Sequence, residues 1–219
     1  MNRILRGAFA AGSLLLAGAA SAQTPPVQPP GQPVATPAAR PAPQGGRGAG
    51  IRTMTLTTTA FTDGGTIPEK YTQAGRDVSP ALAWTGAPDS TVSFVLIVRD
   101  IDAPLGNGSD DMLHWIVWNI AGSARSLPEG LPQGVPPAGQ GNNTMRQISA
   151  SGPYYRGPAA PSTGPVHHYI FELYALDANV NVPAVGMSPP ATRAAVMAAM
   201  AGRIRGKGVL VGLYRRPAP

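Results

Sequence analysis

A run of eight residues, TVSFVLIV at 91–98, is the feature that most limits how this chain of 219 residues can fold. The run is almost entirely apolar and rich in β-branched side chains, which is typical of a strand that is covered on both faces. A similar run, HWIVWNI at 114–120, follows after a polar interval. We therefore expect a sheet whose central strands are buried on both sides.

Three further segments are predicted to be strands, because they are rich in β-branched and aromatic residues and lie between Gly-, Pro- and Asn-rich turns. They are TMTLTTT at 53–59, HHYIFELYAL at 167–176 and GVLVGLY at 208–214. In the second of these, period-two alternation places Tyr169, Phe171, Leu173 and Ala175 on one face and His168, Ile170, Glu172 and Tyr174 on the other.

One helix is expected near the C-terminus. Ser188 is a candidate N-cap, Pro189 and Pro190 suit a first turn, and the helix formers ATRAAVMAAMAGRIRG follow at 191–206. The four-residue spacing of Val196, Met200 and Ile204 would turn these three side chains toward the sheet. The predicted fold class is therefore mostly β, a sandwich with one late helix and long Gly/Pro loops.

The N-terminal residues are expected to lie outside this fold. Residues 1–22 have the pattern of a secretory signal: Arg3 and Arg6, a short apolar stretch and an Ala20-Ser21-Ala22 cleavage site. Residues 23–50 hold eight prolines and five glycines without apolar periodicity, which predicts a disordered linker. The folded domain should then span 51–219, and its location should be periplasmic or secreted.

Composition limits the chemistry of this domain. The formal charge of +6 includes four arginines of the signal and linker, so 51–219 carry 13 basic and 11 acidic side chains. No basic stripe with interleaved aromatic residues occurs, so nucleic-acid binding is not expected. The chain has no cysteine, which excludes disulfides, thiol catalysis and thiolate metal sites.

Polar residues gather at the ends of the predicted strands. Asp100 ends one buried strand, Asp102 lies two residues further on, and an extended backbone would point both carboxylates the same way. His114 opens the next strand and His167 opens a third, each after a long loop. If these ends lie together, two carboxylates and two imidazoles meet at one rim of the sheet.

Five segments in this order resemble the phosphatidylethanolamine-binding protein (PEBP) family, specifically its bacterial Raf-kinase-inhibitor-like branch, over about residues 53–215. One such motif is weak evidence, whereas five in family order are strong evidence. The resemblance implies an antiparallel β-sandwich with Greek-key character and a helix near the C-terminus. The matching segments are GGTIPEKYTQAGRDVSPALAW (64–84), SFVLIVRDIDAP (93–104), HWIVWNI (114–120), YYRGPAAPSTGPVHHYIFELYALD (154–177) and LVGLY (210–214).

The resemblance also implies a small surface pocket that accepts phosphate-like anions such as a phospholipid head group. Carboxylates suit such a pocket if they raise the pKa of the histidines or fix their tautomers. The Gly-Pro loops could add backbone N–H donors, and the Tyr169 hydroxyl could add another. Carried over onto this chain, the ligand-binding residues are Asp100, Asp102, Pro104, His114, Gly157, Pro158, His167 and Tyr169.

The sequence departs from the family pattern at four positions, none of which removes a pocket residue. Ile101 replaces a proline in the Asp-Pro-Asp-Ala-Pro motif, and Ala160 stands where a second proline is common. His168 takes the place of an arginine, and Gln73 that of a frequent cysteine. These changes bear on affinity and ligand preference rather than on the fold.

Three functions are compatible with the sequence. The favoured one is non-enzymatic lipid or anion binding, without a catalytic residue, a metal or another cofactor. The second is inhibition of a protein partner such as a protease or kinase through the surface loops. The third is a metal-dependent or acid/base hydrolase built on the Asp and His residues. By family resemblance a homodimer is expected.

Overall fold

The computed structural model describes residues 50–106, 108, 110–134 and 144–219. The predicted signal (1–22) and all of the predicted linker except Gly50 lie outside the described residues. The described residues belong to one compact unit, Gly45–Pro219. Among them, no helix is both long and apolar enough to cross a bilayer.

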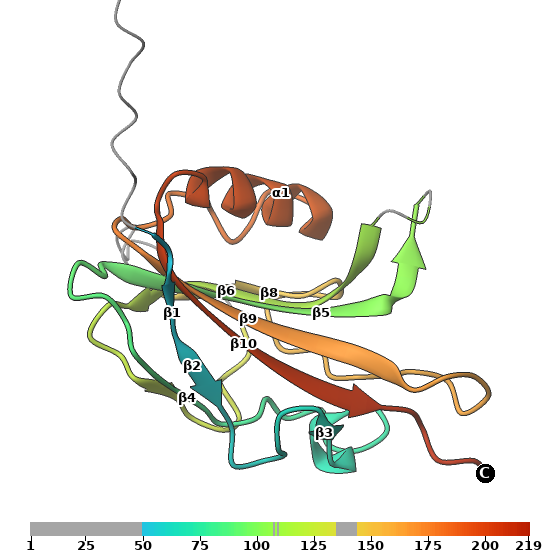
Figure 1. The fold of residues 1–219 in the computed structure, drawn as a ribbon. Coiled ribbons are helices and arrows are strands. Elements are labelled where there is room, and N and C mark those ends of the chain that lie inside the picture. The colour runs from blue at the N-terminus through green and yellow to red at the C-terminus, as the bar shows by residue number, and fades with distance from the viewer. Residues whose placement is uncertain (1–49, 107, 109, 135–143) are drawn as a thin grey trace, which may run out of the picture. The chain divides into compact units, whose positions relative to one another are not determined.

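A seven-stranded sheet forms the centre of the molecule (Figure 1). Its two longest strands, β5 (Ser93–Leu105) and β6 (Asp110–Ala121), contain the two apolar runs of the sequence and pair antiparallel. β5 also pairs antiparallel with β9 (His167–Leu176), which pairs in turn with β10 (Ile204–Tyr214). The remaining members are β8 (Arg146–Ile148) beside β6, and β1 (Arg52–Thr53) and β3 (Gly65–Thr66), which both run parallel to β10.

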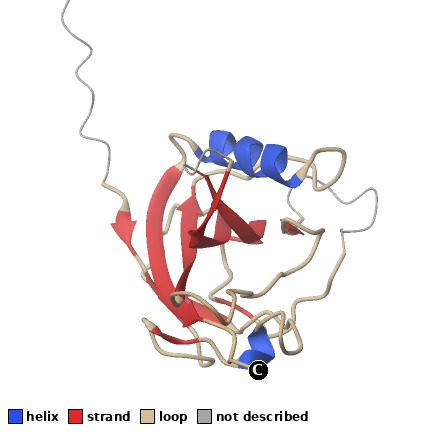
Figure 2. Ribbon diagram, turned by 90° about the vertical axis from the view of Figure 1, so that its right-hand side faces the viewer, coloured by secondary structure: helices blue, strands red, loops and turns tan. Residues whose placement is uncertain are grey.

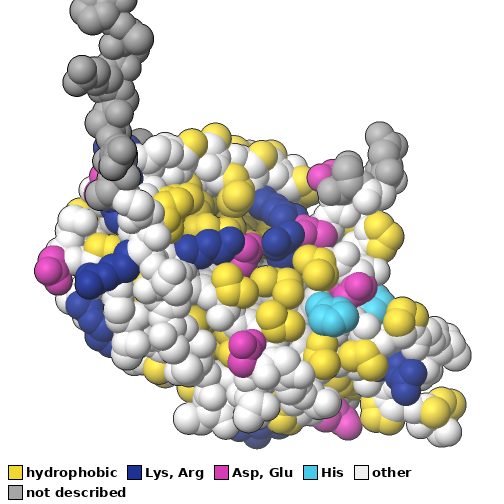
Figure 3. Space-filling view, in the orientation of Figure 1, with side chains coloured by type: hydrophobic (Ala, Val, Ile, Leu, Met, Phe, Trp, Pro, Cys, Tyr) yellow, Lys and Arg dark blue, Asp and Glu magenta, His cyan; other side chains and the backbone are white. Residues whose placement is uncertain are grey.

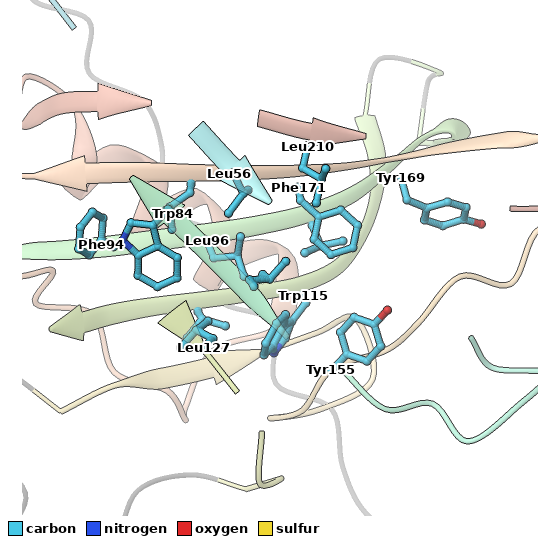
Figure 4. Close-up of a cluster of buried hydrophobic side chains, with 14 of the residues drawn as sticks. Leu56, Trp84, Phe94, Leu96, Trp115, Leu127, Tyr155, Tyr169, Phe171 and Leu210 are labelled. Atoms are coloured by element: carbon cyan, nitrogen blue, oxygen red, sulfur yellow. The ribbon is translucent and has the colours of Figure 1, made fainter. Parts of the chain in front are cut away.

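A smaller sheet packs on one face of the central sheet. It orders β2 (Thr55–Thr57), β4 (Leu82–Thr85) and β7 (Ser126–Leu127), and the short 3₁₀ helix η1 (Glu69–Tyr71) lies between β3 and β4 in the chain. Side chains of both sheets form a continuous core. Figure 4 shows members of this core, with Phe94 and Trp84 at one end and Tyr169 and Tyr155 at the other.

The helix α1 (Pro189–Met200) covers part of the other face, as the two ribbon views show (Figures 1 and 2). Its buried residues include Val196 and Met200, which join a second apolar cluster with Val95 and Ile97 of β5. Over the described residues, two sheets and one α-helix confirm the mostly β prediction.

The predicted end of the helix is wrong. The helix stops at Met200, and Ile204 is the first residue of β10 rather than a residue on the sheet-facing side of the helix. Gly202 has φ of +74°, a conformation that glycine adopts without steric cost and that commonly ends a helix. The N-terminus is as predicted, because the Ser188 side chain accepts a hydrogen bond from the Ala191 N–H.

Candidate functional site

Three strands bring chemically active side chains to one edge of the central sheet. The pairing register sets Asp100 of β5 opposite Tyr169 of β9 on one side and opposite Met112 of β6 on the other. His114 lies two residues beyond Met112 and His167 two residues before Tyr169. Because β5 is central to both pairings, residues far apart in the sequence surround the Asp100 carboxylate.

Asp100 and His167 form a buried pair. The His167 Nδ1 lies 2.8 Å from Asp100 Oδ2, and their side chains are only 12% and 4% exposed. The second carboxylate oxygen accepts a 3.0 Å hydrogen bond from the Asp102 backbone N–H. A carboxylate can only accept here, so Nδ1 of His167 carries a proton and donates it. The expectation that a carboxylate fixes a histidine tautomer therefore holds for this pair.

His114 is held by carbonyl oxygens instead. Its Nδ1 lies 2.8 Å from the Arg156 carbonyl oxygen and 3.0 Å from that of Gly157, so Nδ1 is again the protonated nitrogen. The ring packs edge-on against Tyr169 at 5.1 Å between centroids. Burial lowers the pKa of His114, and the carbonyl contacts and the Asp100 charge offset this only in part. His114 is therefore neutral near pH 7.

The Tyr169 hydroxyl holds the 156–161 loop in place and is not a free hydrogen-bond donor. Its hydroxyl oxygen accepts hydrogen bonds from the backbone N–H groups of Ala159 and Ala160, at 3.3 and 3.1 Å. Burial, reinforced by the negative charge of Asp100, raises the pKa of Tyr169 well above its ordinary value, and the hydroxyl proton faces that carboxylate. The hydroxyl that the sequence offered as a ligand donor is thus already used within the protein.

The loop at 156–161 closes the site and uses up its own N–H groups. Arg156 N donates to the His114 carbonyl oxygen at 3.2 Å, and Gly157 N donates to Asp77 Oδ1 at 2.6 Å. The next two donors go to Tyr169, and the two prolines have no N–H. The expectation that the Gly-Pro segment supplies free backbone donors is therefore wrong.

Glycine is required at 157 because the loop lies directly against an earlier segment. A Cβ there would lie 2.3 Å from the Tyr71 carbonyl oxygen and 2.9 Å from the Thr72 Cα. The approach is secured by Gln73, whose Nε2 donates to the Gly157 carbonyl oxygen at 2.7 Å. Asp77 adopts φ of +54° while its carboxylate accepts the Gly157 N–H. The sequence signal for this contact is the glycine itself.

These residues line a surface cavity of about 180 Å³ that is partly open to solvent. This is the space of roughly six water molecules, and it is below the range of about 300–1,000 Å³ for sites that hold drug-sized ligands. The cavity therefore suits a small ion or head group. It is lined by Gln73, Asp100, Ala103, Met112, His114, Arg156, Ala159, Ala160, Pro161, His167 and Tyr169.

The geometry brings four of the eight predicted residues to the cavity: Asp100, His114, His167 and Tyr169. Asp102, Pro104, Gly157 and Pro158 are not part of the lining, although the Gly157 carbonyl positions His114. Residues 101–103 have no partner in the β5–β6 register, which breaks the strand alternation. The Asp102 carboxylate consequently faces His168, accepting from its N–H at 2.6 Å and from its Nδ1 at 2.9 Å.

Comparison with known proteins identifies a family whose match includes all the strands and the loop that form the cavity. The profile of the family described as phosphatidylethanolamine-binding protein matches residues 57–215. The chain belongs to the phosphatidylethanolamine-binding protein family.

Relatives of this family cover most of the described chain. A UPF0098 protein of Methanothermobacter thermautotrophicus is 40% identical over 166 residues, which are 74% of this chain and 99% of the relative. A PEBP homologue of Chlamydia trachomatis has a solved structure with 31% identity and a TM-score of 0.60, covering 75% of this chain and 98% of its own. The E. coli YbcL structure, at 22% identity and a TM-score of 0.59, covers 74% of this chain and 98% of its own and agrees in fold.

Two polar residues of this PEBP-family cavity were missed in the sequence. Gln73 was noted only as a departure from the family pattern, and Arg156 was not singled out although it precedes the Gly-Pro motif. Both come from loops, where no periodicity indicates which way a side chain points. Among the described residues, Arg156 contributes the one guanidinium of the lining and therefore its one permanent positive charge.

A larger cavity of about 590 Å³ lies where the start of α1 meets β5 and β6. Its charged groups are Asp110 and the mutually paired Asp111 and Arg193, with 2.6 Å between Arg193 Nη1 and Asp111 Oδ1. The histidines are absent from its lining. Within the described part of the chain, no three His, Cys, Asp or Glu side chains are grouped so that they could hold a metal ion.

Proposed function

We propose that this chain is a non-enzymatic binding protein for a small anion or a phospholipid head group. The observation that carries the proposal is the 180 Å³ cavity, in which Arg156 supplies positive charge while Asp100 and two carbonyl groups orient two imidazoles. The size argues for a head group or free anion and against an acyl chain.

The walls of this cavity are held in place before any ligand arrives. Hydrogen bonds fix His114, His167 and Tyr169, and the prolines of the 156–161 loop restrict its backbone. A site that is ordered in advance loses less conformational entropy on binding, which favours affinity for ligands that make few contacts.

The chemistry of the lining supports binding rather than catalysis. Asp100 and His167 have the arrangement of a base and the group that orients it, but the hydroxyl beside them belongs to Tyr169 and is occupied on both sides. Ser162 and Thr163, the hydroxyl residues that directly follow the 156–161 loop in the sequence, are not in the lining.

Calorimetry with phosphate, phosphoethanolamine and acetate tests the proposal. We expect saturable heat for at least one of these ligands and its loss in His167→Ala. The matched control is His168→Ala, because that neighbouring ring is 49% exposed and outside the cavity lining. Absence of heat for all three ligands with the folded wild-type protein would overturn the proposal.

We also propose that the protein is exported, on the strength of the Arg3 and Arg6 charges, the apolar stretch that follows and the Ala-Ser-Ala site. Fractionation of expressing cells with N-terminal mass analysis tests this. The expected mature chain starts at Gln23 and is found outside the cytoplasm, whereas an intact Met1 chain in the cytoplasmic fraction would contradict export.

A further inference from the structure

The hydrogen-bond inventory of the cavity is unusual for an anion site, because it is short of donors. Every N–H of the 156–161 loop is engaged within the protein, and the Tyr169 hydroxyl faces Asp100. Apart from the His167 ring, whose Nδ1 contacts Asp100, the polar donors left in the lining are the Arg156 guanidinium and the Gln73 amide. Each of these already makes one contact, to Ser151 Oγ and to the Gly157 carbonyl oxygen respectively.

His114 adds an acceptor to this set. Its single proton sits on Nδ1 between two carbonyl oxygens that cannot donate, so the neutral ring leaves Nε2 with a lone pair. Within the part of the chain that the structure describes, no group donates to that nitrogen. A ligand oxygen without a proton would meet this lone pair unfavourably.

The groups around His114 keep it in this state. Asp100 of β5 faces it and favours a charged ring, whereas Arg156 opposes a charged ring, and burial opposes it most strongly. Tyr169 of β9 presents its ring at 5.1 Å, and His167 lies on the same rim behind Asp100. Burial thus outweighs the one carboxylate, which is already shared between His167 and a backbone N–H.

We infer that this cavity selects oxyanions that bring their own proton, namely phosphate or a phosphomonoester in its monoanionic form, and that His114 is the residue that sets this preference. The inference rests on the proposed anion-binding function. The P–OH group donates to Nε2 of His114, while the unprotonated oxygens face Arg156. A phosphodiester, the form present in a phospholipid, has no such proton and is disfavoured.

Two pairs of small ligands test the role of the ligand's proton. At pH 6, dimethyl phosphate and about half of the methyl phosphate carry one negative charge, but only the methyl phosphate monoanion has a P–OH. We expect methyl phosphate to bind at least about tenfold more tightly, because the diester leaves the buried acceptor unpaired. Inorganic phosphate should also bind more tightly than sulfate, which has the same shape but is a dianion without a proton at this pH.

The pH dependence should follow the ligand. A phosphomonoester loses its second proton near pH 6, so its apparent affinity should fall about 50-fold between pH 6 and pH 8 as the monoanion fraction drops from one half to about one hundredth. The weak affinity for dimethyl phosphate should change far less over the same interval. Glycerophosphoethanolamine, the diester head group, should behave like dimethyl phosphate.

His114→Gln provides the matched variant, since its amide can offer either a donor or an acceptor to the ligand. We expect the methyl phosphate to dimethyl phosphate ratio to collapse toward one, while His168→Ala keeps the wild-type ratio. Nitrogen-15 NMR of the wild-type histidines supplies a reading independent of any variant: a neutral, Nδ1-protonated His114 at pH 6–8, free and bound.

The possible outcomes distinguish failure of the proton preference from failure of the proposed anion-binding function. Binding of methyl phosphate and dimethyl phosphate with equal affinity, of sulfate as tightly as phosphate, or a His114 imidazolium in the complex would overturn the proton preference and leave anion binding intact. Failure of every phosphate and head-group ligand to bind would remove both.

Discussion

The two faces of the central sheet treat polar groups in opposite ways. The face toward the small sheet is apolar along most of its length, and its few polar groups lie at the edge where the cavity opens. The face toward α1 carries charged side chains across four neighbouring strands, and Figure 3 shows Lys/Arg and Asp/Glu side chains alternating below the helix.

The charges of the helix-side face form one linear chain of ion pairs. Lys207 contacts Glu172 at 2.6 Å, Glu172 contacts Arg99 at 3.0 Å, and Arg99 contacts Asp111 at 2.5 Å. Arg193 of α1 completes the chain at 2.6 Å from Asp111. Each carboxylate lies between two cations, so this chain offers a ligand little that is not already paired.

The comparison shows why charge alone is a poor guide to a binding site. The helix-side face has more ionised groups, but they pair with one another, whereas the cavity is lined by His114, whose Nε2 has no donor, and by Arg156, which makes no ion pair among the described residues. We therefore expect substitutions on the apolar face to lower stability most and those in the charged chain to lower it moderately. Substitutions at the exposed rim of the helix-side face should have little effect on stability.

The largest effect is expected for Phe171→Ala. Phe171 is fully buried in the core between the two sheets and packs against Phe61 at 5.8 Å between ring centroids. Removing the ring should lower the free energy of unfolding by about 3–5 kcal/mol. Urea denaturation at pH 7 measures this, and a loss below that of the charged-chain variant would break the comparison.

An intermediate effect is expected for Glu172→Gln, which leaves Arg99 and Lys207 without their shared carboxylate. Both cations are about one-third exposed, so we expect a loss of only about 1 kcal/mol in the free energy of unfolding. Burial alone would raise the pKa of Glu172, but the contacts with Lys207 and Arg99 outweigh it and hold the pKa below its ordinary 4.5.

The same variant has a defined pH dependence. A carboxyl group whose pKa is lowered by folding stabilises the protein above its ordinary pKa, and this contribution disappears as the pH falls through the folded-state pKa. The stability difference between wild type and Glu172→Gln should thus be full at pH 7 and shrink below about pH 4.5. A difference that grows toward acid pH would contradict the paired geometry.

The smallest effect is expected for Val209→Thr. Val209 lies on the same strand as Lys207, and its side chain is 44% exposed. Threonine has the same branched shape as valine, and at this exposed position its hydroxyl stays in contact with water. The free energy of unfolding should stay within about 0.5 kcal/mol of wild type. A larger loss in the denaturation curve would mean that the outer rim of this face contributes to packing.

Local sequence patterns were sufficient to predict the four longest strands, and the family resemblance added half of the predicted site residues correctly to the cavity. Alternation in β9 correctly assigned Phe171 to the inter-sheet core and Glu172 to the opposite face, because strand geometry fixes side-chain direction with a period of two. The same rule failed at Asp102, because the irregular pairing at 101–103 interrupts the period and no local residue pattern announces it.

Tertiary contacts decided what remained. The end of α1 was signalled by Gly202, but the helix formers around it favoured continuation. Gln73 and Arg156 join the cavity through loops whose course depends on contacts with distant segments. The hydrogen bonds that use up the loop donors link 157 to 77 and 160 to 169, and such pairings are not visible in residue order.

The close approach of Gly157 to the backbone of Tyr71 has a consequence for assembly of the molecule. Segments 84 or more residues apart must meet before the cavity has walls, since it joins residue 73 to the loop after 156 and to the start of β9. No fragment ending before Tyr169 contains a complete set of walls. The proposed ligand would therefore protect only the completely folded domain, and a chain that is still being synthesised could not bind it.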